Sequence, residues 1–365
     1  MYCIICSGNK IKKHNIVCPT FEHAFYNNLS KKLIRYECLD CNIIFNRNLK
    51  SNFKIIFKKN NYKKHSENHT YNINQVSIPK EKLQSHIITK EIIKFKREVN
   101  ILDYGCFDGA LLEELSKLDI INSLVGYDII KPTSRKKNNK IKYFVDDYKN
   151  LSKQYKKAFD IIIFSHSLNY IPRVKYKINQ IFQNLLKDDG LIFIQIPDIT
   201  KKYLNILFDD QLYFFHKYSI IKLFNSISSK FKINFLSNKF ISNDLLVLIR
   251  KNYKNNNFKI NKISIIKFFK KIKIDIKRYQ NLVVDQKSFF IFGSTIDAIF
   301  ASYFFKNKKI SFIDENKKKI NTTINGIRIN SLNTKLHNKK ILIPFSMKAN
   351  NFLKKRLIKN KFLII

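Results

Sequence analysis

The chain is short of acidic residues and has no long apolar run. Of its 365 residues, 27 are Asp or Glu and 69 are Lys or Arg, which gives a formal net charge of +42. The apolar runs are strand-sized, and this excludes a membrane-spanning helix of about 20 apolar residues. The first residues, MYCIICSGNK, lack the basic start and apolar core of an export signal. We therefore expect a soluble, cytoplasmic protein whose thiols stay reduced.

The lysine excess raises the question of nucleic-acid binding, since clustered Lys and Arg bind phosphates. Basic patches occur at Arg135–Lys142 and Phe268–Arg278. The lysines are nevertheless spread along the whole chain, and the aromatic residues do not alternate with them as in a base-stacking surface. We interpret the charge mainly as a solvated surface, which leaves nucleic acid open as a partner without favouring it.

Residues 1–75 carry two CxxC pairs. The four cysteines are Cys3, Cys6, Cys38 and Cys41. Each CxxC turn can present two thiolates to one ion, and two turns complete a tetrahedral Zn²⁺ site with no open position. The sequence therefore predicts a structural zinc unit, with metal-free thiols as the alternative. His14 and Cys18 could substitute as ligands, although Cys18 is more typical of a small buried residue.

A strand followed by a glycine turn organises the middle of the chain. Residues 99–102 form a short apolar run typical of a buried parallel strand, and Gly105 follows it. Because glycine has no Cβ, the turn can be tight and a ligand can approach the backbone. Asp103 closes this strand and Asp128 closes the next, 25 residues later, near the spacing at which an acid meets ribose hydroxyls. We expect a nucleotide-binding crevice between the two acids.

Alternating strands and helices continue beyond this crevice. Strands are expected at Ile141–Val145, Phe159–Phe164, Leu191–Pro197 and Asn243–Arg250, and helices at 77–97 and 178–186. A polar loop is expected at 60–75, and a basic amphipathic helix at 258–279. A second strand–turn–helix–strand unit then predicts a small Rossmann-like domain. Only Gly293 stands in its turn, so we favour a docking or substrate-closing role over a second dinucleotide site.

Five segments between residues 98 and 198 follow one another in a fixed order. They read ILDYGCFDG, VGYD, VDDYKNL, FDIIIFSHSLNYIP and LLKDDGLIFIQIPD. Together they resemble class I S-adenosylmethionine (SAM)-dependent methyltransferases. The CxxC pairs and the tail are similar to those of the three-domain sugar C-methyltransferases. The resemblance implies a zinc-ribbon-like domain at 1–75, a Rossmann-like doubly wound methyltransferase domain at 76–255, and a small C-terminal Rossmann-like α/β domain at 256–365.

The resemblance also implies a set of cofactor-binding residues. They are Asp103, Gly105, Cys106 and Gly109 for the amino-acid end of SAM, Asp128 and Ile129 for the ribose, Asp147 with Asp146 and Tyr148 for the adenine, and Ser165 with His166 along the methyl-transfer crevice. Of the two adjacent acids, Asp147 is favoured over Asp146. Phe107 stands where the family often has a further glycine.

Transfer of a methyl group to carbon requires a base. In sugar C-methyltransferases the acceptor carbon lies next to a keto group, so its proton is acidic. The family's Glu-His pair corresponds here to Asp210 and Gln211, and a second family histidine corresponds to Tyr170. Glutamine cannot act as a base. We predict Asp210 as the base, with His166 and Tyr170 as alternatives, while a different sugar, methylation of oxygen or lost activity stay open.

Three functions follow in order of preference. The first is a SAM-dependent methyltransferase acting on a nucleotide-linked keto sugar or glycan precursor. The second is a zinc-ribbon RNA methyltransferase, although SHSLNYIP offers nothing like an Asn-Pro-Pro-Tyr element to hold a flipped adenine. The third is a non-catalytic binding protein with a SAM-binding fold.

Overall fold

The structure is a computed structural model. It describes residues 2–22, 28–47, 70–73, 76–95, 97–131, 139–228, 230–238, 241, 243–251, 262–284, 287–317, 319–332, 340–347 and 351–364. Most of the loop predicted at 60–75 and the domain boundary predicted at residue 255 lie outside these ranges. None of the helices described is long and apolar enough to cross a membrane.

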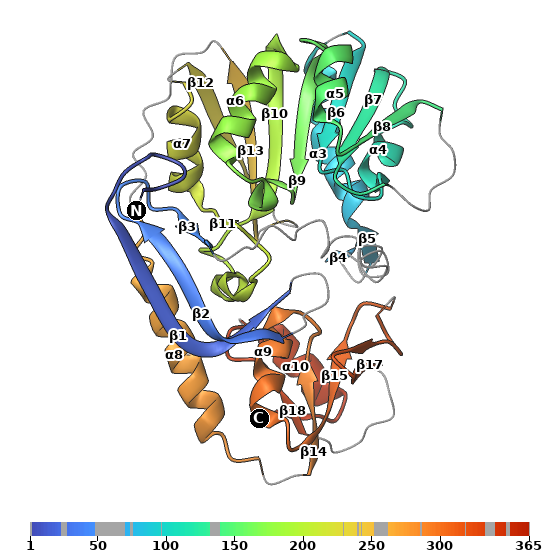
Figure 1. Ribbon diagram of the computed structural model, residues 1–365. Helices are drawn as coiled ribbons and strands as arrows, with labels where there is room; N and C mark the ends of the chain where they lie inside the picture. The colour runs from blue at the N-terminus through green and yellow to red at the C-terminus, as the bar shows by residue number, and fades with distance from the viewer. Residues whose placement is uncertain are drawn as a thin grey trace.

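A seven-stranded sheet forms the centre of the molecule (Figure 1). Its order is β12 (Phe231–Leu236), β13 (Asp244–Lys251), β10 (Leu186–Pro197), β9 (Phe159–Ser165), β6 (Val99–Tyr104), β7 (Ile121–Asp128) and β8 (Ile141–Val145). The five strands from β10 to β8 are parallel, whereas β13 runs antiparallel to both β10 and β12. Because β9 and β6 are central and covered on both faces, their apolar runs are almost unbroken.

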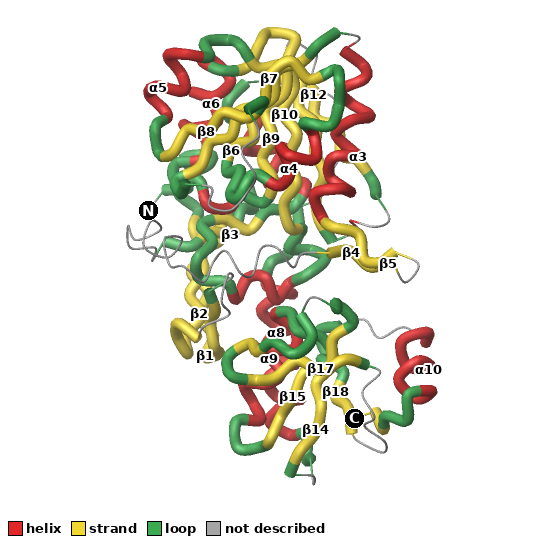
Figure 2. The backbone as a smooth tube through the Cα atoms, turned by 90° about the vertical axis from the view of Figure 1, so that its right-hand side faces the viewer, coloured by secondary structure: helices red, strands yellow, loops and turns green. Residues whose placement is uncertain are grey.

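Helices cover both faces of this sheet, as Figure 2 shows. One face packs against α3 (Lys80–Ile92) and α4 (Ala110–Leu115), and the other against α5 (Tyr148–Gln154), α6 (Val174–Asn184) and α7 (Lys217–Asn225). Alternate strand residues divide between the two cores: Ile161 joins the first and Ile162 the second. The predicted doubly wound, parallel-rich sheet is confirmed.

The N-terminal segment forms a long antiparallel hairpin of β1 (Ile11–Phe21) and β2 (Asn28–Cys38). It continues into β3 (Ile44–Phe45), which pairs with β11 (Tyr213–Phe214) from the segment after the central strands. The hairpin runs along α8 (Ile266–Asn281) toward the C-terminal part of the molecule (Figure 1). The first segment therefore shares its sheet and its core with later parts of the chain.

A third sheet builds the C-terminal part. Its order is β16 (Thr323–Ile324), β17 (Ile327–Ser331), β15 (Lys309–Asp314), β14 (Ser288–Phe292), β18 (Lys340–Leu342) and β19 (Leu363–Ile364), with helices α9 (Ile296–Ser302) and α10 (Asn351–Lys359). All of its pairs are parallel except the β16–β17 hairpin. This is the Rossmann-like pattern predicted for the tail.

Several predicted bounds differ from those observed. The segment before α3 is a hairpin of β4 (Thr70–Ile73) and β5 (Val76–Pro79), and α3 begins only at Lys80. The strand expected at Leu191–Pro197 starts earlier, at Leu186, and shifts register against β9 before Leu191. The sequence analysis identified neither β11 nor β12.

Candidate functional site

The turn after β6 has the shape that the sequence predicts. Gly105 has a φ of +86°, and a Cβ there would collide with the side chain of Ser167. Its N–H donates to the carbonyl of Tyr127 at 2.7 Å, which ties the turn to β7. Gly109, with a φ of +81°, starts α4. Phe107 also has a positive φ, 53°, so the position where a further glycine was expected does adopt a left-handed conformation.

Two acids lie at the carboxyl ends of neighbouring strands: Asp103, which is buried, and Asp128, which is half-buried. Burial raises the pKa of Asp103 to about 7, with Lys80 opposing the shift and Asp128 and Asp108 adding to it. Oδ1 of Asp103 is buried and has no hydrogen-bond partner among the described residues. Asp128 therefore acts electrostatically on Asp103 from the end of the neighbouring strand.

Asp128 also fixes the glycine turn. Its Oδ2 accepts the N–H of Phe107 at 2.7 Å, and its Oδ1 accepts the N–H of Ile130 at 3.2 Å. Burial raises the pKa of this carboxyl as well. Ile129, half-buried, follows directly. Each oxygen of Asp128 keeps a lone pair that could accept a hydrogen bond from a ligand hydroxyl.

The residues after β8 take separate positions. The N–H of Asp146 donates to the carbonyl of Asp128 at 2.7 Å, which holds Asp146 beside the crevice. Asp147 caps α5: its oxygens accept the backbone N–H of Asn150 at 3.1 Å and the side-chain amide at 2.6 Å. Tyr148 packs edge-on against Tyr127, with ring centroids 6.3 Å apart.

The side chain of Cys106 belongs to the core between the sheet and helices α3 and α4. It is 6% exposed and packs with α3 and α4, and burial raises the pKa of its thiol. Its backbone N–H donates to the carbonyl of Tyr127 at 3.1 Å. Cys106 therefore contributes backbone rather than thiol chemistry to the turn.

A polar group follows the central strand β9. Ser165 accepts a hydrogen bond from Gln84 of α3 at 2.7 Å. His166 has a φ of +54°, and its Nε2 lies 3.3 Å from Oδ2 of Asp244 at the start of β13. Burial and then Lys80 lower the pKa of His166, while Asp244 opposes the shift. The imidazole is therefore neutral at neutral pH.

The other predicted base residues lie in a neighbouring loop. Gln211 donates to the hydroxyl of Tyr170 at 3.4 Å, so the two positions where the resembled family has histidines contact each other here. Asp210 is 1% exposed and interacts electrostatically with the guanidinium of Arg35. Arg35 also pairs with Asp209 at 2.8 Å. Asp210 thus lies in a charge cluster that the N-terminal hairpin completes.

The four CxxC cysteines converge at the base of this hairpin. Their sulfur atoms all lie within 4.8 Å of one another. Two pairs, Cys3 with Cys41 and Cys6 with Cys38, are 3.5 Å apart. Four sulfur donors at this separation fit the tetrahedral thiolate coordination of zinc. Cys18 is buried outside the group, as predicted, and His14 pairs with Glu37 at 2.8 Å.

Four polar residues of the site escaped the sequence analysis: Lys80, Gln84, Gln195 and Asp244. Gln195 gave a usable signal, since it interrupts the apolar run LIFIQIP of a buried strand. Gln84 likewise lies on the buried side of α3. Lys80 does not stand out in a chain with so many lysines. Asp244 does not stand out either, because polar residues are ordinary at the start of a strand.

Comparison with known proteins gives one match to a family. Residues 75–230 match the family described as "Methyltransferase domain". No curated protein matches the chain.

Solved structures of similar fold include several methyltransferases. The plantazolicin methyltransferase BpumL in complex with SAH is 19% identical, over 47% of this chain and 82% of that one, with a TM-score of 0.37. A SAM dependent methyltransferase from Archaeoglobus fulgidus is 19% identical, over 56% and 89%, with a TM-score of 0.36. The CurJ carbon methyltransferase is 12% identical, over 48% and 54%, with a TM-score of 0.39.

Proposed function

We propose that this SAM-dependent methyltransferase, whose residues 75–230 match a methyltransferase-domain family, methylates a nucleotide-linked sugar or glycan precursor at a carbon next to a keto group. The observation that carries the acceptor class is a pair of lysines between the central and third sheets. Lys202 follows the carboxyl end of β10, and Lys319 follows that of β15. Each lysine thus lies beyond the strand ends where α/β sheets bind ligands.

The two ammonium groups are close enough to repel each other. Burial lowers the pKa of Lys319, Asp314 opposes the shift, and Lys202 adds to it. Lys319 also donates to the hydroxyl of Ser294 at 3.3 Å. A diphosphate placed between the lysines would relieve their repulsion and favour both charged forms. A nucleotide-linked sugar carries such a diphosphate next to its sugar ring.

The crevice beside β6 and β7 fits the methyl donor. Asp103 and the backbone from Gly105 to Gly109 would hold the amino-acid end, Asp128 with Ile129 the ribose, and Asp146, Asp147 and Tyr148 the adenine. The orphaned oxygen of Asp103 supports this placement. When bound, SAM supplies an electrophilic methyl group. Ser165 and His166 would lie along the path to the acceptor.

The chain's own residues must then bind the acceptor, exclude water and take one proton. Gln211 and Tyr170 supply no strong base between them. Asp210 is compensated by Arg35, so His166 is the better-placed proton acceptor of the predicted set. Asp209, which pairs with Arg35 and accepts a hydrogen bond from Asn46, holds the loop before β11 against the hairpin.

Zinc is the second proposed cofactor. Four thiolates at the base of the hairpin would hold one Zn²⁺ in a closed, structural site, since no coordination position is left for a substrate. Metal analysis of the purified protein tests this. About one equivalent of zinc is expected, and less than about half an equivalent would argue against a closed four-thiolate site.

The acceptor class is tested by following consumption of the methyl donor over nucleotide-linked keto sugars and total RNA. Turnover is expected with a nucleotide keto sugar. Turnover only with RNA, with affinity that falls steeply with salt, would instead favour an RNA methyltransferase.

A matched pair of variants sharpens the test. Lys202→Ala should raise KM for the sugar nucleotide about tenfold, the loss of one charge-assisted contact, and leave the Kd for SAM unchanged. The neighbouring, exposed Lys201 provides the control, since Lys201→Ala should change neither constant. An equal effect of both variants would contradict the placement of the diphosphate beside Lys202.

A further inference from the structure

A chain of polar side chains lies at the carboxyl ends of β9 and β10. Gln195 is fully buried within β10, where every neighbouring residue of the strand is apolar. A buried polar side chain persists only where its hydrogen bonds are satisfied. The partners of Gln195 therefore indicate why the position is polar.

The oxygen and the nitrogen of the Gln195 side-chain amide each have a hydrogen-bond partner, and the two partners lie on different elements. Its Oε1 accepts from Gln84 of α3 at 2.8 Å, and its Nε2 donates to Oδ2 of Asp244 at 2.7 Å. Its backbone carbonyl accepts the N–H of His166 at 2.8 Å. Gln195 thus fixes both the backbone of His166 and the carboxylate that contacts the His166 ring.

The imidazole and the carboxylate are both largely shielded from water. The side chains of His166 and Asp244 are 29% and 11% exposed, with 3.3 Å between Nε2 and Oδ2. Nε2 of His166 is buried and makes no hydrogen bond among the described residues, and Oδ2 of Asp244 lies within ion-pair distance of it. A small rotation of the ring would direct a proton on Nε2 at this carboxylate and leave the lone pair on Nδ1. A base oriented by a third group in this way is the common arrangement of proton-accepting histidines.

We propose that Asp244, held by Gln195, is the positioning residue that makes His166 the proton acceptor for the methylated carbon. This rests on the proposed function. The proton of the acceptor C–H bond moves to Nδ1 of His166. The electron pair of that bond forms the new bond to the methyl carbon, while the methyl–sulfur bond breaks and its pair stays on sulfur. The imidazolium, stabilised by the Asp244 carboxylate, then returns its proton to water.

The charges around His166 suit this role. Lys80, at the start of α3, disfavours the protonated ring, and Asp244, at the start of β13, favours it. Lys80 also interacts with the carboxylates of Asp103 and Asp108 on the cofactor side. One ammonium group therefore acts on both the carboxylates of the donor crevice and the histidine.

The pairing can be measured without any substrate. The chain has eight histidines. In ¹⁵N NMR spectra of histidine-labelled protein, the signals of His166 are assigned as those that disappear in His166→Gln. The wild type should show the tautomer protonated on Nε2. In Asp244→Asn the pKa of His166 should fall by at least about one unit, since an opposite charge within hydrogen-bonding range shifts a pKa by one to three units. Asp189→Asn, at an exposed carboxylate, is the control and should leave it unchanged.

Kinetics then separate this inference from the acceptor assignment. With a thymidine diphosphate-linked 4-keto hexose as the probe, His166→Gln should lower kcat at least 100-fold and Asp244→Asn about tenfold or more, with the Kd for SAM unchanged. Asp244→Glu, which keeps the charge, should restore part of kcat and covers the case in which Asp244→Asn does not fold.

Two outcomes overturn the proposal. One is a His166 protonated on Nδ1 in the wild type or unresponsive to Asp244→Asn. The other is turnover that survives in His166→Gln, which leaves the proposed function standing and moves the base elsewhere. If the wild type methylates no keto sugar while the NMR results hold, the acceptor class fails and the His166–Asp244 pairing remains.

Discussion

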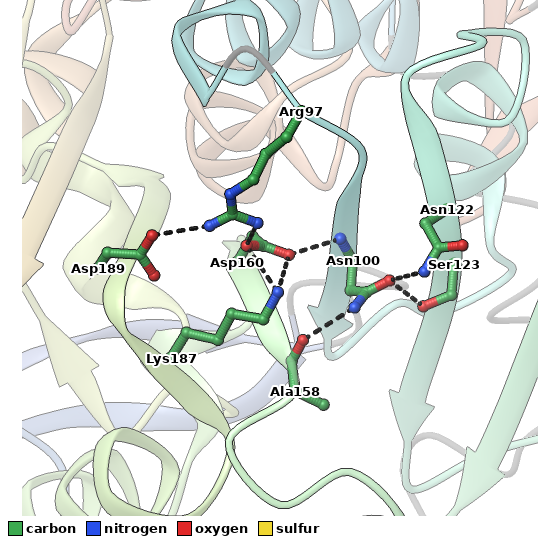
Figure 3. A network of polar contacts seen from close by, with 8 residues as sticks. All are labelled: Arg97, Asn100, Asn122, Ser123, Ala158, Asp160, Lys187 and Asp189. Atoms are coloured by element: carbon green, nitrogen blue, oxygen red, sulfur yellow. Dashed lines mark hydrogen bonds and ion pairs between the residues drawn. The ribbon is translucent and has the colours of Figure 1, made fainter.

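Two buried aspartates, one at each edge of the central sheet, are treated in opposite ways. Asp160, near the start of β9, is fully buried and lies among cations and N–H donors at the amino edge (Figure 3). Arg97 pairs with it, Lys187 contacts both of its oxygens at 2.8 and 2.9 Å, and the N–H of Asn100 donates at 2.9 Å. Asp103, 2% exposed at the carboxyl edge, has an orphaned oxygen and a pKa raised to about 7.

The difference separates a structural charge from a charge kept ready for a ligand. At the amino edge the protein supplies every partner, and the network continues from Asn100 to Asn122 and Ser123 (Figure 3). At the carboxyl edge the protein leaves a carboxylate underpaired, which lowers stability and persists where function requires it. A buried aspartate that lacks partners thus identifies the edge of the sheet that is kept free for a ligand.

The largest effect is expected from Asp160→Ala. The substitution removes a shared partner of Arg97, Lys187 and one backbone N–H. The free energy of unfolding should therefore fall by about 3–5 kcal/mol, as when one partner of a buried ion pair is removed. Urea unfolding measures this. Asp189→Ala, which removes the exposed partner of Arg97, is the control and should change stability by less than about 1 kcal/mol. Equal effects would show that burial at this edge matters little.

The pH dependence of stability should reflect Asp103. Its folded pKa of about 7 lies above the ordinary value of 3.8, so the folded state binds the proton more tightly than the unfolded chain. The resulting stability is complete below about pH 4 and is lost as pH rises to about 7, up to ~4 kcal/mol in all. Asp103→Asn should flatten this fall when unfolding free energies are compared across that range. Parallel curves for the two proteins would contradict the raised pKa.

Much of this edge can be predicted because its signals are local. A short apolar run, a glycine and an acid at the next strand end lie within about 30 residues, and each follows from backbone conformation or burial. Phe107 has a positive φ although it is not glycine, so the left-handed backbone at this position is set by the turn and not by the residue type. The CxxC pairs are similarly local, and their convergence follows from the length of the β1–β2 hairpin.

The rest depends on contacts between distant segments. Gln84 and Gln195 are 111 residues apart, and no sequence pattern at either position predicts their contact. The two-residue strand β11 exists only because β3 offers it an edge. Asp160 and Asp103 both read as acids at the ends of apolar strands, so their opposite roles emerge only when Arg97 and Lys187 are found beside one of them. Tertiary partners, not propensity, decide these features.

Binding of the methyl donor gives the next effect in size. Asp103→Asn should weaken SAM roughly 10–100-fold, since a hydrogen bond to a charged group contributes about 1.5–3 kcal/mol. Its stability at neutral pH should be equal to or above that of the wild type, because an underpaired buried charge is gone. Calorimetric titration with SAM measures the affinity. Unchanged affinity would mean that the orphaned oxygen faces no ligand.

The smallest effect is expected from Arg97→Ala at the amino edge. The Arg97 side chain is 40% exposed, and Asp160 keeps Lys187 and the Asn100 N–H when Arg97 is lost. The free energy of unfolding should therefore fall by only about 0.5–1 kcal/mol, the range of partly exposed ion pairs, and less at high salt. Lys187→Ala is the matched variant, and its more buried ammonium group should matter more. A loss from Arg97→Ala as large as that from Asp160→Ala would mean that the carboxylate depends on one cation, and the amino edge would then be no better satisfied than the edge that binds the methyl donor.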